Sequence, residues 1–172
     1  MAITATRTPQ TLAWSNFTSV ATLIDPADGG AMDAYTSFDY VTPSGWTTID
    51  GRFAFSDGQV VRVSPRARVR TGVAQTADLL AHEQFHYDVG FVIARRVARE
   101  LGRLRARTMA DLAREQDAII ALHFHRRAGL IQRRYDIDTR HGRNAHYQAL
   151  YLKLMAACIA NPSATHFNGW WL

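Results

Sequence analysis

The stretch Ala81-His82-Glu83-Gln84-Phe85-His86-Tyr87-Asp88 contains two histidines four positions apart, with a glutamate directly after the first. The surrounding apolar residues recur at helical spacing, and residues four apart lie on one face of a helix, about 6 Å apart along its axis. His82 and His86 can therefore offer two imidazoles to one metal ion, and Glu83 can reach a metal-bound water. This is the arrangement of zinc hydrolases. The sequence thus predicts a zinc site with Glu83 as the catalytic base.

The composition predicts a single domain with a core of its own. The chain has 172 residues, of which 47% are hydrophobic. Its only cysteine, Cys158, lies in an apolar run and indicates a buried, inert thiol. No apolar run reaches the length of a membrane-spanning helix, and the N-terminus lacks the layout of a signal peptide. As written, the sequence predicts a cytoplasmic protein without a membrane partner, whose export would require a signal that has been removed.

The net charge of +5 raises the question of a nucleic-acid partner. The positive charge comes almost entirely from arginine, with Lys153 the only lysine. Several arginines recur at the spacing of a solvated helix face, namely Arg95, Arg96, Arg99, Arg103 and Arg107. We therefore expect a peptide or protein substrate, and we disfavour nucleic acid as the main partner.

Residues 1–70 have mainly β-strand character. Strands are expected at Thr18–Ile24, Tyr35–Val41, Gly51–Phe55 and Val60–Val63. The segment Ser56-Asp57-Gly58 predicts a hairpin between the last two. We expect a small, mostly antiparallel sheet, and Pro65 with the alternating segment Arg66–Arg70 closes this half of the chain.

Residues 75–160 have mainly helical character. Thr76 is the expected N-cap of a long helix that carries the His-Glu motif. Thr108 is the expected N-cap of a second helix, which runs to about Arg134 and packs antiparallel to the first. A third helix is expected at 145–159, followed by a tail, 161–172, whose Trp170 and Trp171 should fold back onto the protein. Strands first and helices after predict an α+β domain spanning 1–172.

A catalytic zinc site takes a third protein ligand. Glu100 lies fourteen residues beyond His86 on the same predicted helix, roughly 20 Å away, and is excluded. If the two long helices form a tight hairpin, His123 and His125 come opposite His86, although both also fit the edge of the core. His141 is the stronger candidate, because it lies in a polar, glycine-containing segment that can bend back over the first helix.

Two separated motifs carry a resemblance to a known family. The first is Thr76–Asp88, which includes the metal motif, and the second, Tyr135–Asn144, reads Tyr-Asp-Ile-Asp-Thr-Arg-His-Gly-Arg-Asn. Together they resemble a family of bacterial zinc-dependent metalloproteases of the zincin class, whose patterns are HEQ-x-H-aromatic-D and YD-x-x-T-x-HG-x-N. The segment Leu12–Phe17 is similar to the start of that family. The resemblance spans most of the chain and implies a zincin-like fold.

The resemblance also assigns roles to individual residues. It implies zinc as the cofactor, His82 and His86 as ligands, Glu83 as base, and His141 as the third ligand. Four further residues are singled out as groups that orient the histidines by hydrogen bonds, namely Asp88, Tyr135, Asp136 and Asn144. Tyr135 has the alternative role of donating to the oxyanion of the transition state.

The resulting expectation is a zinc metallopeptidase in which Glu83 activates a metal-bound water and then passes the proton to the leaving amine. An exposed strand near Val60–Val63 could pair with an extended peptide substrate. Two alternatives remain open. One is a metal-binding or partner-binding protein that keeps the ligands without turnover. The other, less favoured, is an arginine-rich nucleic-acid binder in which the motif is incidental.

Overall fold

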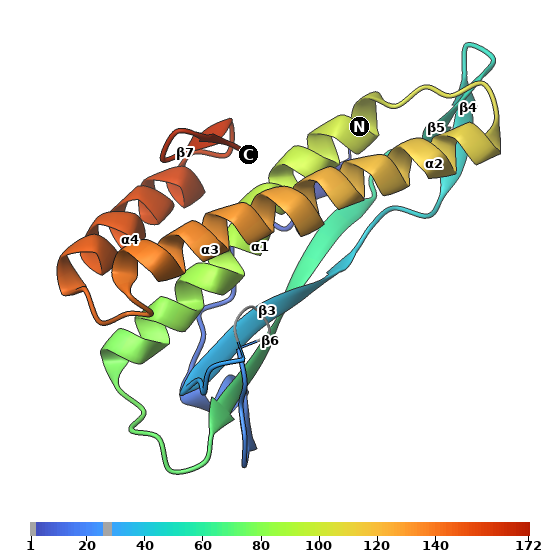
Figure 1. The fold of residues 1–172 in the computed structure, drawn as a ribbon. Helices are drawn as coiled ribbons and strands as arrows, with labels where there is room; N and C mark the ends of the chain where they lie inside the picture. Colours follow the sequence, from blue (N-terminus) through green and yellow to red (C-terminus); the bar gives the residue numbers. More distant parts are fainter. Residues whose placement is uncertain (1–2, 26–28) are drawn as a thin grey trace.

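The computed structural model describes residues 3–25 and 29–172, and it places a twisted sheet beneath a layer of helices (Figure 1). Strands come first along the chain and helices follow. The α+β class predicted from the order of the strand and helix segments is therefore confirmed. The long helices lie along the sheet, so the core forms between the two layers.

The strands are β1 (Thr4–Ala5), β2 (Phe17–Val20), β3 (Ala34–Val41), β4 (Trp46–Ile49), β5 (Arg52–Phe55) and β6 (Val60–Arg70). β6 is the central strand: β1 and β2 join one edge in parallel, and β3 joins the other edge antiparallel. The four-stranded sheet is thus mixed, because the N-terminal segment runs in the same direction as β6. β6 also continues through Pro65 to Arg70, beyond the expected end.

The expected hairpin at Ser56–Gly58 is wrong. β5 pairs with β4, and β6 pairs with β3. The β4–β5 turn is the dipeptide Asp50-Gly51, in which both residues have positive φ, at 49° and 72°. Two such residues make the tight turn that matches strand twist, and Asp-Gly is a strong signal for it. The sequence interpretation overlooked this dipeptide.

Helix α1 (Ala77–Arg103) begins as predicted, with the Thr76 side chain accepting a hydrogen bond from the Leu79 amide at 3.2 Å. Its buried face lies against β3 and β6. At Gly90 an added Cβ would come within 2.5 Å of the Phe38 ring. A glycine at this position therefore lets the aromatic side chain of β3 lie directly on the helix.

The second long helix is composed of α2 (Met109–Ile120), the π-helical segment η2 (Ala121–Arg127) and α3 (Ala128–Thr139). It runs antiparallel to α1 and extends past the expected end at Arg134 (Figure 1). The two helices do not form a tight hairpin. The connection runs outward past the end of α1, and Ala106 bonds to the backbone of Phe53 in both directions at 2.9 Å. This connection displaces the start of α2, and it thereby changes which residues of the two long helices lie opposite each other.

The last elements are α4 (Ala145–Ala160) and a short hairpin, β7 (His166–Phe167) with β8 (Trp170–Trp171). The expected burial of the two tryptophans is wrong, since Trp171 is 58% exposed and Trp170 is 37% exposed. Phe167 and Leu172 are the buried residues of this segment instead, with 2% and 1% of their surface exposed. Among the described residues, no helix has the length and apolar character to cross a membrane.

Candidate metal centre

The two motif histidines project from one face of α1 into the protein. His82 and His86 are 4% and 7% exposed, and Glu83 between them is 2% exposed. The Nε2 atoms of the two imidazoles are 3.3 Å apart. Helical spacing of four residues produces this convergence, because each side chain rises from the same side of successive turns.

Asp136 on α3 completes the group. Its Oδ1 lies 3.2 Å from His82 Nε2 and 3.1 Å from His86 Nε2. In the described part of the chain, these three residues form the group whose atoms could hold a metal ion. The shifted register between the long helices explains the contact, since it brings residue 136 rather than residue 125 opposite His86.

The electrostatics of the group favour a cation at its centre. Three potential electron-pair donors, two of them buried imidazole nitrogens, meet within 3.3 Å. Oδ1 of Asp136, which faces the two imidazoles, and Oε2 of Glu83 are buried without a hydrogen-bond partner in the structure, and so are the Nδ1 atoms of both histidines. Buried polar atoms are rarely left unpaired in proteins. The donor set therefore fits a metal ion held by His82, His86 and Asp136.

The ionisable groups of this cluster shift one another's pKa values. Burial acts to raise the pKa of Asp136, but the two histidines outweigh it, so the pKa lies well below its usual range. For His86, burial acts to lower the pKa, and Asp136, Glu83 and Gln132 more than reverse this, so the pKa is raised. Asp136 is thus held as a carboxylate, the form that binds metal.

Glu83 is in a different environment from Asp136. Burial raises its pKa above the ordinary value, although His86, His82 and Thr36 oppose the shift. Its Oε2 has no hydrogen-bond partner. A carboxylate whose pKa is raised accepts a proton more readily than an ordinary glutamate, and the unpaired Oε2 gives it an atom on which to do so.

Tyr135 packs against the motif. Its ring stacks on His82, with centroids 4.8 Å apart, and on Phe85, with centroids 3.8 Å apart. The residue is fully buried, and burial together with the nearby carboxylates of Asp136 and Glu83 raises the pKa of its hydroxyl. Tyr135 therefore contacts His82 through its ring, where the sequence led us to expect a hydrogen bond.

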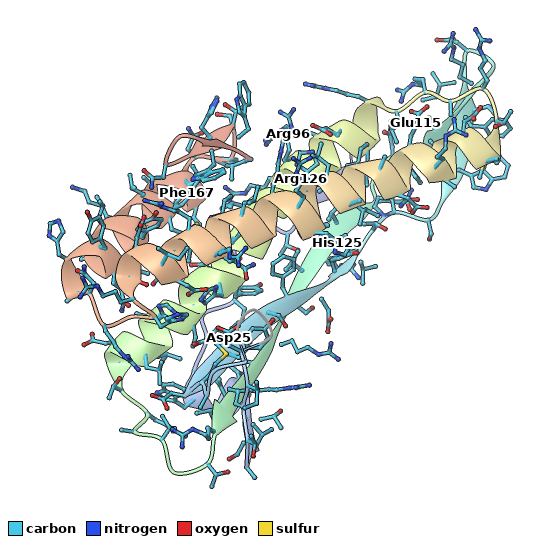
Figure 2. The ribbon with its side chains drawn as sticks, in the orientation of Figure 1. Asp25, Arg96, Glu115, His125, Arg126 and Phe167 are labelled. Carbon is cyan, nitrogen blue, oxygen red and sulfur yellow. The ribbon has the colours of Figure 1, made fainter. Side chains whose placement is uncertain are left out.

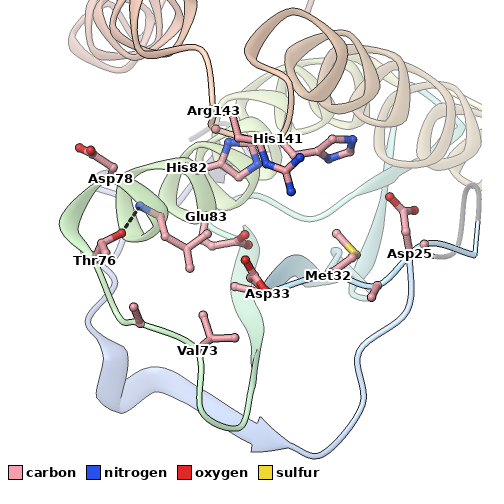
Figure 3. Close-up of a pocket in the computed structure, with 16 residues that line it drawn as sticks. Asp25, Met32, Asp33, Val73, Thr76, Asp78, His82, Glu83, His141 and Arg143 are labelled. Atoms are coloured by element: carbon pink, nitrogen blue, oxygen red, sulfur yellow. Dashed lines mark hydrogen bonds between the residues drawn. The ribbon is translucent and has the colours of Figure 1, made fainter.

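A pocket of about 520 Å³ opens beside His82 and Glu83 (Figure 3). One wall is the start of β3 and the residues before it, including Met32 and Asp33. Another is the loop between α3 and α4, from which His141 and Arg143 project over the cavity. Glu83 thus has access to a space large enough for part of a substrate.

The structure does not bring His141 into the metal group. It lies at the pocket wall, is exposed, and has a φ of 54°, in the left-handed region. The alternatives His123 and His125 are also elsewhere. His123 Nε2 is 3.0 Å from Glu100 Oε2. His125, which Figure 2 labels, has its Nε2 3.0 Å from the hydroxyl of Tyr40 on β3.

Two residues expected to orient the histidines have other contacts. Asp88 accepts a hydrogen bond from Gln84 at 2.8 Å, and Gln84 in turn accepts from the Leu12 amide at 2.7 Å. Asn144 is the N-cap of α4, accepting from the Tyr147 amide at 3.3 Å. These residues join segments of the fold, and neither contacts the imidazole Nδ1 atoms.

Sequence reasoning placed Asp136 near the site but in the role of orienting the histidines. The feature that could have identified Asp136 as a candidate ligand is its position on the second helix, which extends to Thr139. Gln132 and Gln148, which lie beside His86 and His82, were missed altogether. Only the packing of α3 and α4 against α1 identifies them.

Comparison with known proteins adds no relative: no family, curated protein or solved structure matches this chain. The functional assignment therefore depends on the chemistry of the site.

Proposed function

We propose that this protein is a zinc-dependent metallopeptidase with a zincin-like fold, in which His82, His86 and Asp136 hold the zinc ion and Glu83 is the general base. One observation carries the proposal. Three ligand atoms converge from two helices, and the Glu83 carboxylate, whose Oε2 has no hydrogen-bond partner, adjoins them at the wall of a pocket. A structural metal site would require neither the additional carboxylate nor the pocket.

The spacing of the ligand atoms suits zinc. Zinc binds imidazole nitrogen and carboxylate oxygen at about 2.0–2.1 Å, and a tetrahedron with such bonds has edges of about 3.3 Å. The three separations are 3.1, 3.2 and 3.3 Å. Two histidines and one carboxylate are a known catalytic zinc set, and they leave a position open. The same donors also suit iron(II), so metal analysis belongs in the test.

The ion, when bound, supplies Lewis acidity that lowers the pKa of water and polarises the substrate carbonyl. Glu83 then takes the proton from the attacking water and delivers it to the leaving amine. Burial favours both steps, because it raises the pKa of Glu83 above its ordinary value and makes the side chain a better proton acceptor. Tyr135 does not line the pocket, so we assign its ring to holding His82 in place, in preference to the oxyanion role.

The substrate-binding strand is β3 in this proposal. The expected strand near Val60–Val63 belongs to β6, whose two edges are covered by β1 and β3. β3 pairs with β6 along one edge, and the described residues provide no strand for the other. Ala34 and the residues before it line the pocket. An extended peptide paired with this edge would lie beside Glu83.

The test combines metal analysis of the purified protein with cleavage of a mixed peptide library. We expect one zinc ion per chain and cleavage that a chelator abolishes. Glu83→Gln should retain the zinc and lose activity by about 10²- to 10⁴-fold, because the base is removed while the ligands remain. The matched control is Glu115→Gln, which changes a carboxylate outside the metal group.

The outcomes separate the alternatives. Stoichiometric metal without cleavage of any peptide would replace the enzyme with a non-catalytic metal-binding protein. A metal-free chain that binds nucleic acid with steep salt dependence would favour the arginine-rich binder. Loss of zinc from Glu83→Gln would contradict the role given to Glu83.

A further inference from the structure

Gln148 is an unusual residue for its position on α4. It is 5% exposed, and its neighbours on the buried face of this helix are Tyr151, Met155 and Cys158. Its Nε2 donates a hydrogen bond of 2.9 Å to the backbone carbonyl of Asp78, one turn before His82 on α1. This bond places the amide nitrogen of Gln148 against the Asp78 carbonyl, and it leaves the amide oxygen, Oε1, for another partner.

Gln148 Oε1 and His82 Nδ1 are both buried without a hydrogen-bond partner in the structure. Both flank Gly142. A Cβ added there would lie 3.1 Å from Gln148 Oε1 and 3.4 Å from His82 Nδ1. The two unpaired atoms therefore border the same small space beside Gly142, although they are not hydrogen-bonded to each other in the structure.

The two atoms are chemically complementary. His82 directs Nε2 towards Asp136 and His86, at 3.2 and 3.3 Å. When Nε2 binds a metal, the neutral imidazole carries its hydrogen on Nδ1, which then needs an acceptor. The Gln148 amide oxygen is an acceptor that needs a donor. Leaving either group unpaired in the protein interior is unfavourable, because each loses its hydrogen bonds to water on burial.

We propose that Gln148 is a positioning residue of the metal centre: when the metal is bound, its Oε1 accepts the Nδ1 hydrogen of His82 and thereby fixes Nε2 as the ligating nitrogen. The proposal rests on the metal-binding role of His82 given above. Gly142 is part of the arrangement. Its φ of 81° and its lack of Cβ allow the loop between α3 and α4 to lie close to both the amide and the imidazole.

Paired variants separate this role from ordinary packing. Gln148→Leu removes both the donor to Asp78 and the acceptor for His82. Gln148→Glu removes only the donor. Competitive zinc titration should show binding weakened about 10- to 100-fold in Gln148→Leu, and affinity within about threefold of the wild type in Gln148→Glu. Equal losses in both variants would mean that the Asp78 contact matters, and the proposal would be overturned.

A measurement on the unmodified protein protects the test against variants that fail to fold. Long-range ¹H–¹⁵N spectra of the zinc-loaded protein report which imidazole nitrogen carries the hydrogen. We expect His82 to show a slowly exchanging Nδ1 hydrogen, and a His82 imidazole with its hydrogen on Nε2 would refute the proposal. If the wild type binds no zinc, the proposed function fails. If the wild type and Gln148→Leu bind it equally, only this inference fails.

Discussion

Replacing Asp136 by asparagine tests the proposed centre most directly, because Asp136 is the candidate ligand that the helix register supplies. The substitution keeps the size of the side chain and removes the negative charge that lies 3.1 and 3.2 Å from the two imidazoles. Zinc bound by four protein ligands contributes roughly 12 kcal/mol, or about 3 kcal/mol per ligand. Losing one good ligand should therefore weaken zinc binding by about 100- to 200-fold.

The assay is a competitive titration with a chromophoric zinc chelator, and His141→Ala is the matched control. His141 lies at the pocket wall outside the metal group, so this variant should keep wild-type affinity. Thermal unfolding without metal checks that both variants fold. Wild-type zinc affinity in Asp136→Asn, together with loss of zinc from His141→Ala, would refute the geometric argument and restore His141 as the third ligand.

Two further predictions concern stability. Burial raises the pKa of Asp88 from 3.8 to about 6, against the opposing bond from Gln84. The charged form therefore costs about 3 kcal/mol at neutral pH, a cost present above pH 6 and absent below about pH 4. Asp88→Asn should raise the free energy of unfolding by up to that amount at pH 7.5 and leave it unchanged at pH 4; equal effects at both pH values would contradict the burial argument. Gly90→Ala would place a Cβ 2.5 Å from the Phe38 ring, and it should lower the free energy of unfolding by about 1–2 kcal/mol despite the better helix propensity of alanine. Gly129→Ala, where no atom lies within 4 Å, is the control and should stabilise by about 1 kcal/mol in the same urea titration. A Gly90→Ala protein as stable as this control would show that Phe38 moves away freely.

The α+β class and the helix starts were predictable because their signals are local. Thr76 and Thr108 both cap helices through bonds to the third residue that follows. Strand pairing was harder, since the chain offers two turn signals, Asp50-Gly51 and Ser56–Gly58, and only one of them joins neighbouring strands. The Asp50-Gly51 turn joins β4 to β5, and this leaves β6 to pair with β3. The prediction for the tail was wrong because burial there also depends on distant contacts. Phe167 and Leu172 are buried, and the larger Trp170 and Trp171 remain exposed.

The sequence alone determined the pair His82 and His86 with Glu83 between them, because a helix fixes the relative positions of residues four apart. Only the tertiary structure decided what joins them. The connection through Ala106 bonds to Phe53 and carries the second helix outward before it turns back. Asp136 rather than His125 then faces the motif, a shift of about three turns. Such a register depends on contacts between distant segments, and local sequence patterns do not encode it.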